Sequence, residues 1–198
     1  RILINTPMDH KKHNGFMSVA LKIAKKGNED TKPNPKVGAV VVKNGEMVGS
    51  GHHIKAGEDH AEVIAIKNSG KNAVGATLYV TLEPCSHFAK TPPCVEYIVN
   101  SGIKEVVIGS MDINPDVNGK GIDYLKAHNI KIVNNILSDQ SQALNIGFFS
   151  RMSRGIPYVR SKIASSIDGR TSLKNDESKW ITSDFSRNDV QQHRKEAC

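Results

Sequence analysis

Residues 77–94 read TLYVTLEPCSHFAKTPPC, and this stretch gives the clearest indication of the fold in the sequence. Thr77 to Leu82 is a continuous, largely apolar run, which is typical of a strand buried on both faces. A loop rich in Pro and Cys follows it. Pro93 to Gly102 then has Pro near its start and Gly at its end, the preferred arrangement in a helix. The stretch therefore predicts a buried strand, a loop and a helix within an α/β sheet.

The flanking sequence alternates between helical and extended patterns. It predicts helices over residues 14–27, 60–69, 118–128 and 138 to about 152, and strands over 37–43, 47–54, 105–108 and 130–133. Asn44-Gly45 joins the first two strands as a tight hairpin. We therefore expect a sheet of five strands, with the first pair antiparallel and the rest parallel, and helices on both faces. This α/β domain is expected to span residues 8–153.

A second pattern begins after the Arg154-Gly155-Ile156-Pro157 segment. Tyr158 to Ala164 and Trp180-Ile181 have strand-like composition, Asp168-Gly169 predicts a turn, and 182–198 predicts a helix capped by Thr182 or Ser183. A segment of this length rarely buries a core of its own. We therefore expect residues 157–198 to be the incomplete start of a second α/β domain. An extension that docks on the first domain is the alternative.

Composition restricts the classes of protein that the chain can be. Its 198 residues carry a net charge of +7, 38% are hydrophobic and 5% are aromatic. The hydrophobic content argues against disorder, and no apolar run approaches the roughly 20 residues of a membrane-spanning helix. The charge suits an anionic partner, either a phosphorylated small molecule or nucleic acid, although few aromatic residues are present for base stacking. Three cysteines and no visible secretory leader lead us to expect the cytoplasm and no membrane association.

Three residues have the chemistry of a zinc site. His60, Cys85 and Cys94 supply one imidazole and two thiols, each at a helix start or a strand end. Three protein ligands leave the fourth tetrahedral position open for water, which is typical of catalytic zinc, and His87 is the candidate that would close it. Glu62 lies two residues after His60 and could move protons as a general acid and base. A Cys85–Cys94 disulfide is the alternative explanation for the cysteines.

The combination of His60-Ala61-Glu62 with Pro84-Cys85 and Cys94 is similar to the signature of zinc deaminases. With its eight-residue spacing between the cysteines, the loop resembles the deaminase half of the bifunctional riboflavin-biosynthesis deaminase/reductase family. That family has Gly where this chain has Ala89. Further similar segments are residues 33–38, 51–53, 56–62, 112–115, 161–170 and 178–183, so the resemblance covers nearly the whole chain.

The resemblance implies a cytidine-deaminase-like three-layer α/β/α sandwich with a central mixed sheet. It implies zinc-dependent hydrolytic deamination of 2,5-diamino-6-ribosylamino-4(3H)-pyrimidinone 5′-phosphate, with zinc on His60, Cys85 and Cys94 and with Glu62 as the catalytic residue. The residues that would bind the substrate are Asn34, His53 and Lys90 at the pyrimidine, and Asp112 and Asn114 near the ribose phosphate.

In the family's second activity, NADPH reduces the ribose. By resemblance, Ala164 and Trp180 would contact the nucleotide, and Ser178 and Arg194 the substrate. NADPH is expected only in a complete reductase domain, because no Gly-rich phosphate loop follows a strand here. We therefore expect no reductase activity from these 198 residues.

Two other functions remain open at this point. One is a zinc deaminase that acts on cytidine, deoxycytidylate or tRNA adenosine, against which the loop spacing and the reductase-like tail argue. The other is a non-catalytic zinc module that binds nucleic acid, against which Glu62 argues, because a structural site does not need it. The sequence also leaves open whether copies of the chain form a homo-oligomer.

Overall fold

The computed structural model describes residues 7–88, 92–114, 117–178 and 180–196. The chain divides into two compact units, Arg1–Pro157 and Tyr158–Cys198, and each is described by itself below. In the described ranges, no helix is both long enough and apolar enough to cross a membrane.

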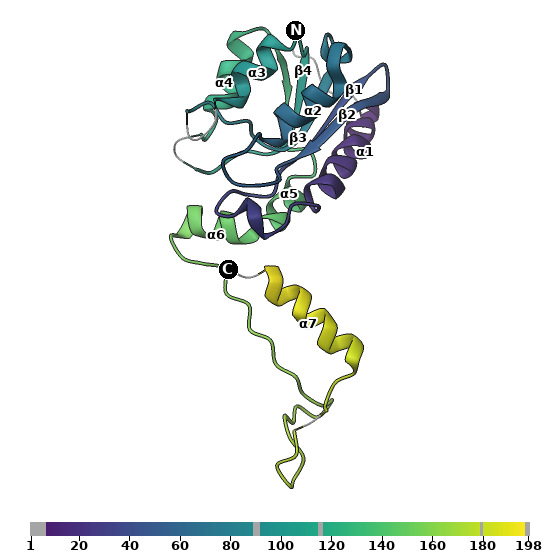
Figure 1. The fold of residues 1–198 in the computed structure, drawn as a ribbon, viewed down its shortest axis with the longest axis vertical. Helices are drawn as coiled ribbons and strands as arrows, with labels where there is room; N and C mark the ends of the chain where they lie inside the picture. Colours follow the sequence, from purple (N-terminus) through teal and green to yellow (C-terminus); the bar gives the residue numbers. More distant parts are fainter. Residues whose placement is uncertain (1–6, 89–91, 115–116, 179, 197–198) are drawn as a thin grey trace. The chain divides into compact units, whose positions relative to one another are not determined.

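The first unit is built on a mixed five-stranded sheet in the order β2-β1-β3-β4-β5 (Figure 1). The strands are β1 (Gly38–Lys43), β2 (Glu46–His52), β3 (Thr77–Leu82), β4 (Glu105–Ser110) and β5 (Lys131–Val133). The predicted parallel pairing holds for β3 with β4 and for β4 with β5. β3 also pairs with β1, and that pairing is antiparallel, which the sequence did not indicate. β1 therefore runs opposite to the other four strands.

The turn between β1 and β2 confirms the Asn44-Gly45 prediction. Both residues have positive φ, 54° at Asn44 and 85° at Gly45. Asn and Gly adopt this conformation more readily than other residues, and its twist matches that of the flanking antiparallel strands. The hairpin places the last residue of β2, and His53 directly after it, at the end of the sheet where the candidate site lies.

Helices cover both faces of the sheet and make three layers, as predicted. α2 (Ala61–Ser69), α3 (Cys94–Asn100) and α4 (Lys120–Ala127) pack on one face, where residues such as Ala65, Ile98 and Leu125 join the buried cluster. α1 (Pro7–Ala24) and α5 (Ser138–Leu144) pack on the other through Met17, Leu21 and partly buried Leu144. Two short 3-10 helices, η1 (Glu29–Thr31) and η2 (Gly70–Ala73), complete the unit.

The single helix expected over residues 138–152 is wrong. The chain instead forms α5 and α6 (Ile146–Arg154), which are separated at Asn145, where φ is −120° and ψ is 34°. The Asn145 side chain accepts a hydrogen bond from the Lys36 backbone N–H and donates one to the Lys36 carbonyl, both at 2.8 Å. This pair of contacts anchors Asn145 to a segment more than 100 residues away in sequence, so the helix breaks there. The break allows α6 to border the pocket described below.

The second unit contains one helix among its described residues, α7 (Asp184–Glu196). Ser183 caps it, because its hydroxyl accepts a hydrogen bond from the Ser186 backbone N–H at 3.3 Å. The strands expected over Tyr158 to Ala164 and at Trp180-Ile181 are absent from the described part of this unit. Val159 and Ile163 are 80% and 75% exposed, and β-branched composition forms no strand where no neighbouring strand pairs with it.

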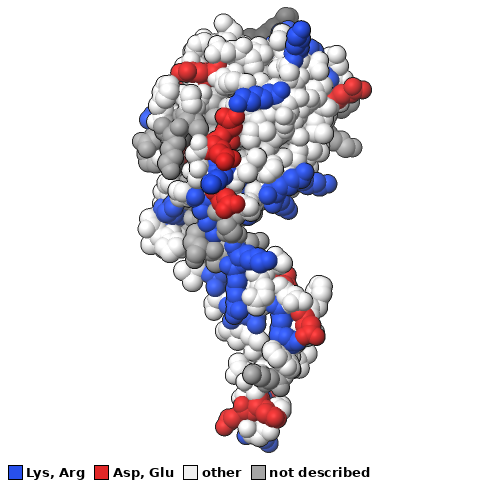
Figure 2. Space-filling view, in the orientation of Figure 1, with Lys and Arg blue, Asp and Glu red and all other residues white. Residues whose placement is uncertain are grey.

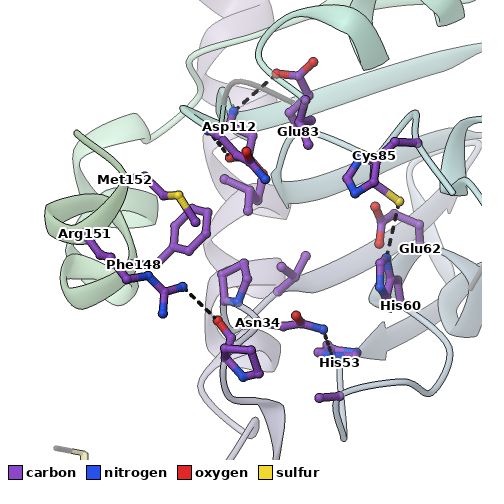
Figure 3. Close-up of a pocket in the computed structure, with 18 of the residues that line it drawn as sticks. Asn34, His53, His60, Glu62, Glu83, Cys85, Asp112, Phe148, Arg151 and Met152 are labelled. Atoms are coloured by element: carbon purple, nitrogen blue, oxygen red, sulfur yellow. Dashed lines mark hydrogen bonds between the residues drawn. The ribbon is translucent and has the colours of Figure 1, made fainter. Parts of the chain in front are cut away.

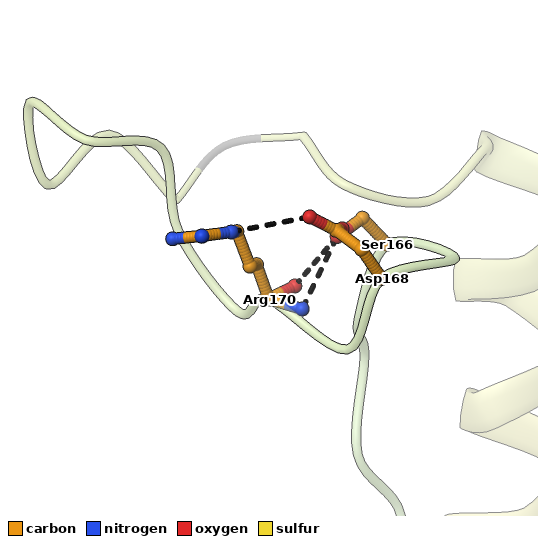
Figure 4. Close-up of polar contacts among 3 residues, drawn as sticks. All are labelled: Ser166, Asp168 and Arg170. Carbon is orange, nitrogen blue, oxygen red and sulfur yellow. Dashed lines mark hydrogen bonds and ion pairs between the residues drawn. The ribbon is translucent and has the colours of Figure 1, made fainter.

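The predicted turn at Asp168-Gly169 is present in the second unit. Gly169 has a φ of 80°, and the Ser166 backbone N–H donates to the Arg170 carbonyl at 2.9 Å. Asp168 accepts hydrogen bonds from the Ser166 hydroxyl and, at 3.1 Å, from Arg170 Nε (Figure 4). These contacts are local to the loop and exposed, so they stabilise the turn and little else.

Candidate active site

The first unit brings the three predicted metal-ligating residues together from three separate elements. His60 is the N-cap of α2, Cys85 lies beyond the end of β3, and Cys94 is the first residue of α3. Their donor atoms all lie within 4.8 Å of one another, with His60 Nδ1 at 3.1 Å from Cys94 Sγ and 3.6 Å from Cys85 Sγ. Both cysteines are free thiols, so the alternative of a Cys85–Cys94 disulfide is wrong.

The geometry of this group fits a tetrahedral zinc ion. Bonds of about 2.3 Å to sulfur and about 2.0 Å to nitrogen would separate the N and S ligands by roughly 3.5 Å. The two observed N–S distances, 3.1 and 3.6 Å, are close to that separation. In the described residues the group comprises these three side chains and does not include His87. His87 instead lines the adjoining pocket, where its Nδ1 is buried and has no hydrogen-bond partner among the described residues.

The three side chains shift one another's pKa values, and the shifts favour a thiolate at Cys85, the form in which cysteine binds zinc. Hydrogen bonds from Cys94 and from His60 lower the pKa of Cys85 to about 4 despite its burial. The hydrogen bond to Cys85 raises the pKa of His60 to about 9. The pKa of Cys94 is raised by its hydrogen bond with Cys85 and by burial. The Cys94 backbone N–H, at the start of α3, also donates to Cys85 Sγ at 3.4 Å and stabilises a thiolate there.

Glu62 lies beside this group without belonging to it. It is the second residue of α2, its side chain is 3% exposed, and it lines the pocket. Figure 3 shows its carboxylate between His60 and Cys85. Burial raises the pKa of Glu62 to about 7, while the charge on His60 opposes the rise. A carboxyl group in this place can both accept and release a proton near neutral pH.

His60, Glu62 and Cys85 line one end of a cavity of about 380 Å³, which is large enough for a small-molecule ligand (Figure 3). Four of the residues that the resemblance implies for substrate binding also line it: Asn34, His53, Asp112 and Asn114. Residues 89–91 lie outside the described residues, and Lys90 is therefore not placed.

A chain of hydrogen bonds orients Asn34. His53 Nδ1 lies 3.2 Å from the Asp59 carbonyl oxygen, which can only accept, so Nδ1 carries the proton and donates it. Burial lowers the pKa of His53, so the ring is neutral and Nε2 accepts a hydrogen bond from the Asn34 amide nitrogen at 3.1 Å. The Asn34 side-chain oxygen is left as an acceptor for a donor on a bound ligand.

Asp112 and Asn114 follow β4 on another side of the cavity. The Asn114 backbone N–H donates to Asp112 Oδ1 at 2.8 Å, which closes a turn around the carboxylate. Burial raises the pKa of Asp112 to about 6, and the neighbouring charge of Glu83 acts in the same direction. Asp112 is 7% exposed and lines the cavity, so its carboxylate is an acceptor for a donor on a bound ligand.

Glu83 is a residue that the sequence reasoning missed. It directly follows β3 and is 4% exposed. Its two carboxylate oxygens accept four backbone hydrogen bonds at 3.1–3.3 Å, from the N–H groups of Asp112, Gly119, Gly121 and Ile122. Glu83 thereby ties the Asp112 loop and the start of α4 to the end of β3. The feature of the sequence that could have indicated this role is an acidic residue directly after a buried strand.

We expect Glu83→Gln to lower the free energy of unfolding by about 2–4 kcal/mol. The new amide nitrogen would face two N–H donors that lose their acceptor in a buried place. Urea unfolding at saturating zinc measures the change. Glu105→Gln is the matched control, because Glu105 pairs with Lys131 and Thr77 near the surface. This variant should lose less than about 1 kcal/mol of its free energy of unfolding. Equal losses in the two variants would contradict this role for Glu83.

The four residues predicted for the reductase chemistry, Ala164, Ser178, Trp180 and Arg194, belong to the second unit. Trp180 is 71% exposed, and the Arg187 guanidinium lies 4.1 Å from the centre of its ring, within cation–π range. Ser178 and Arg194 are exposed as well. Their contacts within this unit define no nucleotide site, so their roles stay predictions.

A match to a protein-family model identifies the class of protein to which the chain belongs. Residues 10–110 match the family model described as the cytidine and deoxycytidylate deaminase zinc-binding region. The three-layer fold, the His/Cys/Cys group and this match together define a zinc-binding deaminase of the cytidine-deaminase class.

The more particular relationship comes from individual relatives. The chain is 53% identical over 182 residues to the riboflavin biosynthesis protein RibD of Buchnera aphidicola subsp. Baizongia pistaciae, covering 92% of this chain and 49% of the relative. It is 50% identical over 142 residues to the diaminohydroxyphosphoribosylamino-pyrimidine deaminase of Buchnera aphidicola subsp. Schizaphis graminum, covering 72% of this chain and 97% of that protein. The chain belongs to the RibD family of riboflavin-biosynthesis deaminases.

A solved structure agrees with this assignment. Acinetobacter baumannii RibD superposes with a TM-score of 0.87 at 49% sequence identity, covering 94% of this chain and 52% of that one. Residues 157–198 match the model described as the RibD C-terminal domain. The chain spans about half the length of the curated RibD relatives it matches.

Proposed function

We propose that the first unit is a zinc-dependent aminohydrolase that deaminates 2,5-diamino-6-ribosylamino-4(3H)-pyrimidinone 5′-phosphate. The observation that carries the proposal is the convergence of His60, Cys85 and Cys94 beside the buried Glu62 at one end of a small-molecule cavity. The name of the deaminase relative, 97% of which this chain covers, supports the substrate class. Residues 8–153 are proposed as the deaminase domain.

Zinc held by His60, Cys85 and Cys94 would supply an activated water, because the ion lowers the pKa of bound water toward 7. Glu62 takes one proton from the attacking water and passes it to the ring nitrogen next to the amino-bearing carbon. The water oxygen bonds to that carbon. Glu62 then carries the second proton of this oxygen to the amino nitrogen, the C–N bond breaks, and ammonia leaves as the carbonyl forms. One water is consumed and one ammonia is released.

Polar side chains of the cavity would orient the substrate for this step. The Asn34 side-chain oxygen, oriented through His53 and Asp59, would accept a hydrogen bond from the pyrimidine edge. Asp112 and Asn114 would meet the ribose. Lys90 is proposed at the pyrimidine from the resemblance alone.

We propose residues 157–198 as the N-terminal part of a reductase domain, with Ala164 and Trp180 toward NADPH and Ser178 and Arg194 toward the sugar. The match to the RibD C-terminal domain supports this assignment. Location in the cytoplasm and homo-oligomer formation stay predictions.

The deaminase proposal is tested by measuring ammonia release from the diaminopyrimidine phosphate, with and without a chelator. We expect release that the chelator abolishes and added zinc restores. Cytidine, deoxycytidylate and a tRNA adenosine substrate form parallel arms, and preferential turnover of any of them would overturn the proposed substrate.

A salt-sensitive complex with DNA or RNA and no ammonia release would favour the nucleic-acid-binding alternative. On the face drawn in Figure 2, described basic and acidic side chains of the first unit are interspersed. That face therefore gives no support to a continuous basic stripe of the kind that binds nucleic acid.

Trp180 provides a test of the second unit. We expect NADPH to leave its fluorescence unchanged in the 198-residue chain, because the ring is largely exposed and contacts Arg187. It is the only tryptophan, so the signal reports on this unit alone. Quenching that saturates at micromolar NADPH would show instead that these residues complete a nucleotide site.

A further inference from the structure

We propose that Arg151, on α6, forms an anion subsite that binds the 5′-phosphate of the substrate, a role that rests on the proposed deaminase function. Among the described residues that line the cavity, Arg151 is the only Lys or Arg. The lining also includes the carboxyls of Glu62, Glu83 and Asp112 and the ring of His60, which is a candidate metal ligand. A phosphate dianion is therefore attracted to the Arg151 side of the cavity and repelled from the carboxyls.

The position of Arg151 suits the distal end of an elongated ligand. In Figure 3 it lies on the opposite side of the cavity from His60 and Cys85, with Phe148 and Met152 of the same helix beside it. Asp112 lies on another side of the same cavity. A ligand with its amino-bearing ring at Glu62 and its ribose at Asp112 would then extend its phosphate toward α6.

Contacts at the rim of the cavity hold the guanidinium in place while leaving donors free. Arg151 Nη2 donates to the Pro33 carbonyl oxygen at 3.4 Å, a long hydrogen bond that uses one of its five N–H groups. The two Asn145 hydrogen bonds to Lys36 anchor the start of α6 to the same loop. The remaining N–H groups of an exposed guanidinium can bind two phosphate oxygens in the usual bidentate manner.

Arg154 offers a matched control on the same helix. It lies one turn after Arg151, carries the same charge and does not line the cavity. Its Nη2 donates to the Ser150 hydroxyl at 2.6 Å, a contact within its own helix. A long-range effect of net charge would affect both arginines alike, whereas a phosphate contact depends on Arg151 alone.

The experiment compares Arg151→Gln, Arg151→Lys and Arg154→Gln on the diaminopyrimidine ribosyl phosphate and on the same compound without phosphate. We expect Arg151→Gln to lower kcat/KM for the phosphorylated substrate by about 10- to 100-fold, mainly through KM. Turnover of the dephosphorylated compound should change less than about twofold, which also shows that the variant is folded. Arg151→Lys should retain part of the discrimination, and Arg154→Gln should retain all of it.

Inorganic phosphate gives a direct probe of the subsite. It should inhibit wild-type turnover of the phosphorylated substrate competitively and inhibit Arg151→Gln much more weakly. Equal loss with both substrates in Arg151→Gln, or an equal effect of Arg154→Gln, would overturn the subsite. Absence of ammonia release from both compounds by the zinc-loaded wild type would instead overturn the proposed function, so the two failures are distinguishable.

Discussion

Glu62→Gln should keep its zinc and lose about 10²- to 10⁴-fold in the rate of ammonia release. The amide has nearly the same size as the carboxylate and can still hydrogen-bond, but it cannot carry a proton from water to the ring and then to the leaving amine. Glu62 is 3% exposed and lies beside the His60, Cys85 and Cys94 group, so no other described carboxyl replaces it there. Single-turnover measurement of ammonia, together with elemental analysis for zinc, tests the two halves of this expectation.

Glu96→Gln is the control for this variant. Glu96 lies two residues after Cys94 in the first turn of α3, the same offset that Glu62 has from His60, but it does not line the cavity. The Glu96→Gln variant should release ammonia at the wild-type rate. A Glu62→Gln enzyme that kept more than about half of that rate would remove Glu62 from the mechanism.

Cys94→Ser should reduce both zinc content and activity to near background, and it should make the protein less stable. Cys94 is 1% exposed, and its sulfur is one of three donors that come from three different elements. A hydroxyl is a much poorer zinc ligand than a thiolate. A metal present at about 1,000 times its Kd stabilises the folded state by about 4 kcal/mol, and this contribution disappears with the ion.

Thermal unfolding with and without a chelator measures that contribution. The midpoint of the wild type should fall when the chelator is added, whereas that of Cys94→Ser should already be low and should not respond. Cys198→Ser removes the remaining cysteine of the sequence and should behave as the wild type. A chelator-insensitive wild type with full ammonia release would exclude zinc from both roles.

Several features followed from local sequence because local chemistry determines them. The buried run over β3, the Asn44-Gly45 turn and the Pro and Gly residues around α3 each specify backbone conformation over a few residues. The candidate metal ligands could also be proposed from the sequence, because imidazole and thiol groups are the donors that zinc prefers. The proposed chemistry at Glu62 followed from its offset from His60.

Other features depended on partners that are distant in sequence. Composition over residues 158–164 favoured a strand, yet none forms, because a strand exists only through hydrogen bonds to a neighbour. The break at Asn145 arises from two hydrogen bonds to Lys36, and no local signal in residues 138–154 marks it. The four amide contacts of Glu83 likewise join segments 29 to 39 residues apart.

The sequence by itself determined the layers of the first unit, its candidate metal ligands and Glu62 as the candidate general acid and base. The reason is that spacing and side-chain chemistry are local properties. Only the tertiary structure decided which polar groups share a cavity with them. It showed that the candidate metal group does not include His87 and that His53 orients Asn34. It also placed Arg151 across the cavity on a helix whose existence depends on the break at Asn145. The physical reason is that long-range hydrogen bonds and packing set these positions, and no periodicity in the chain encodes them.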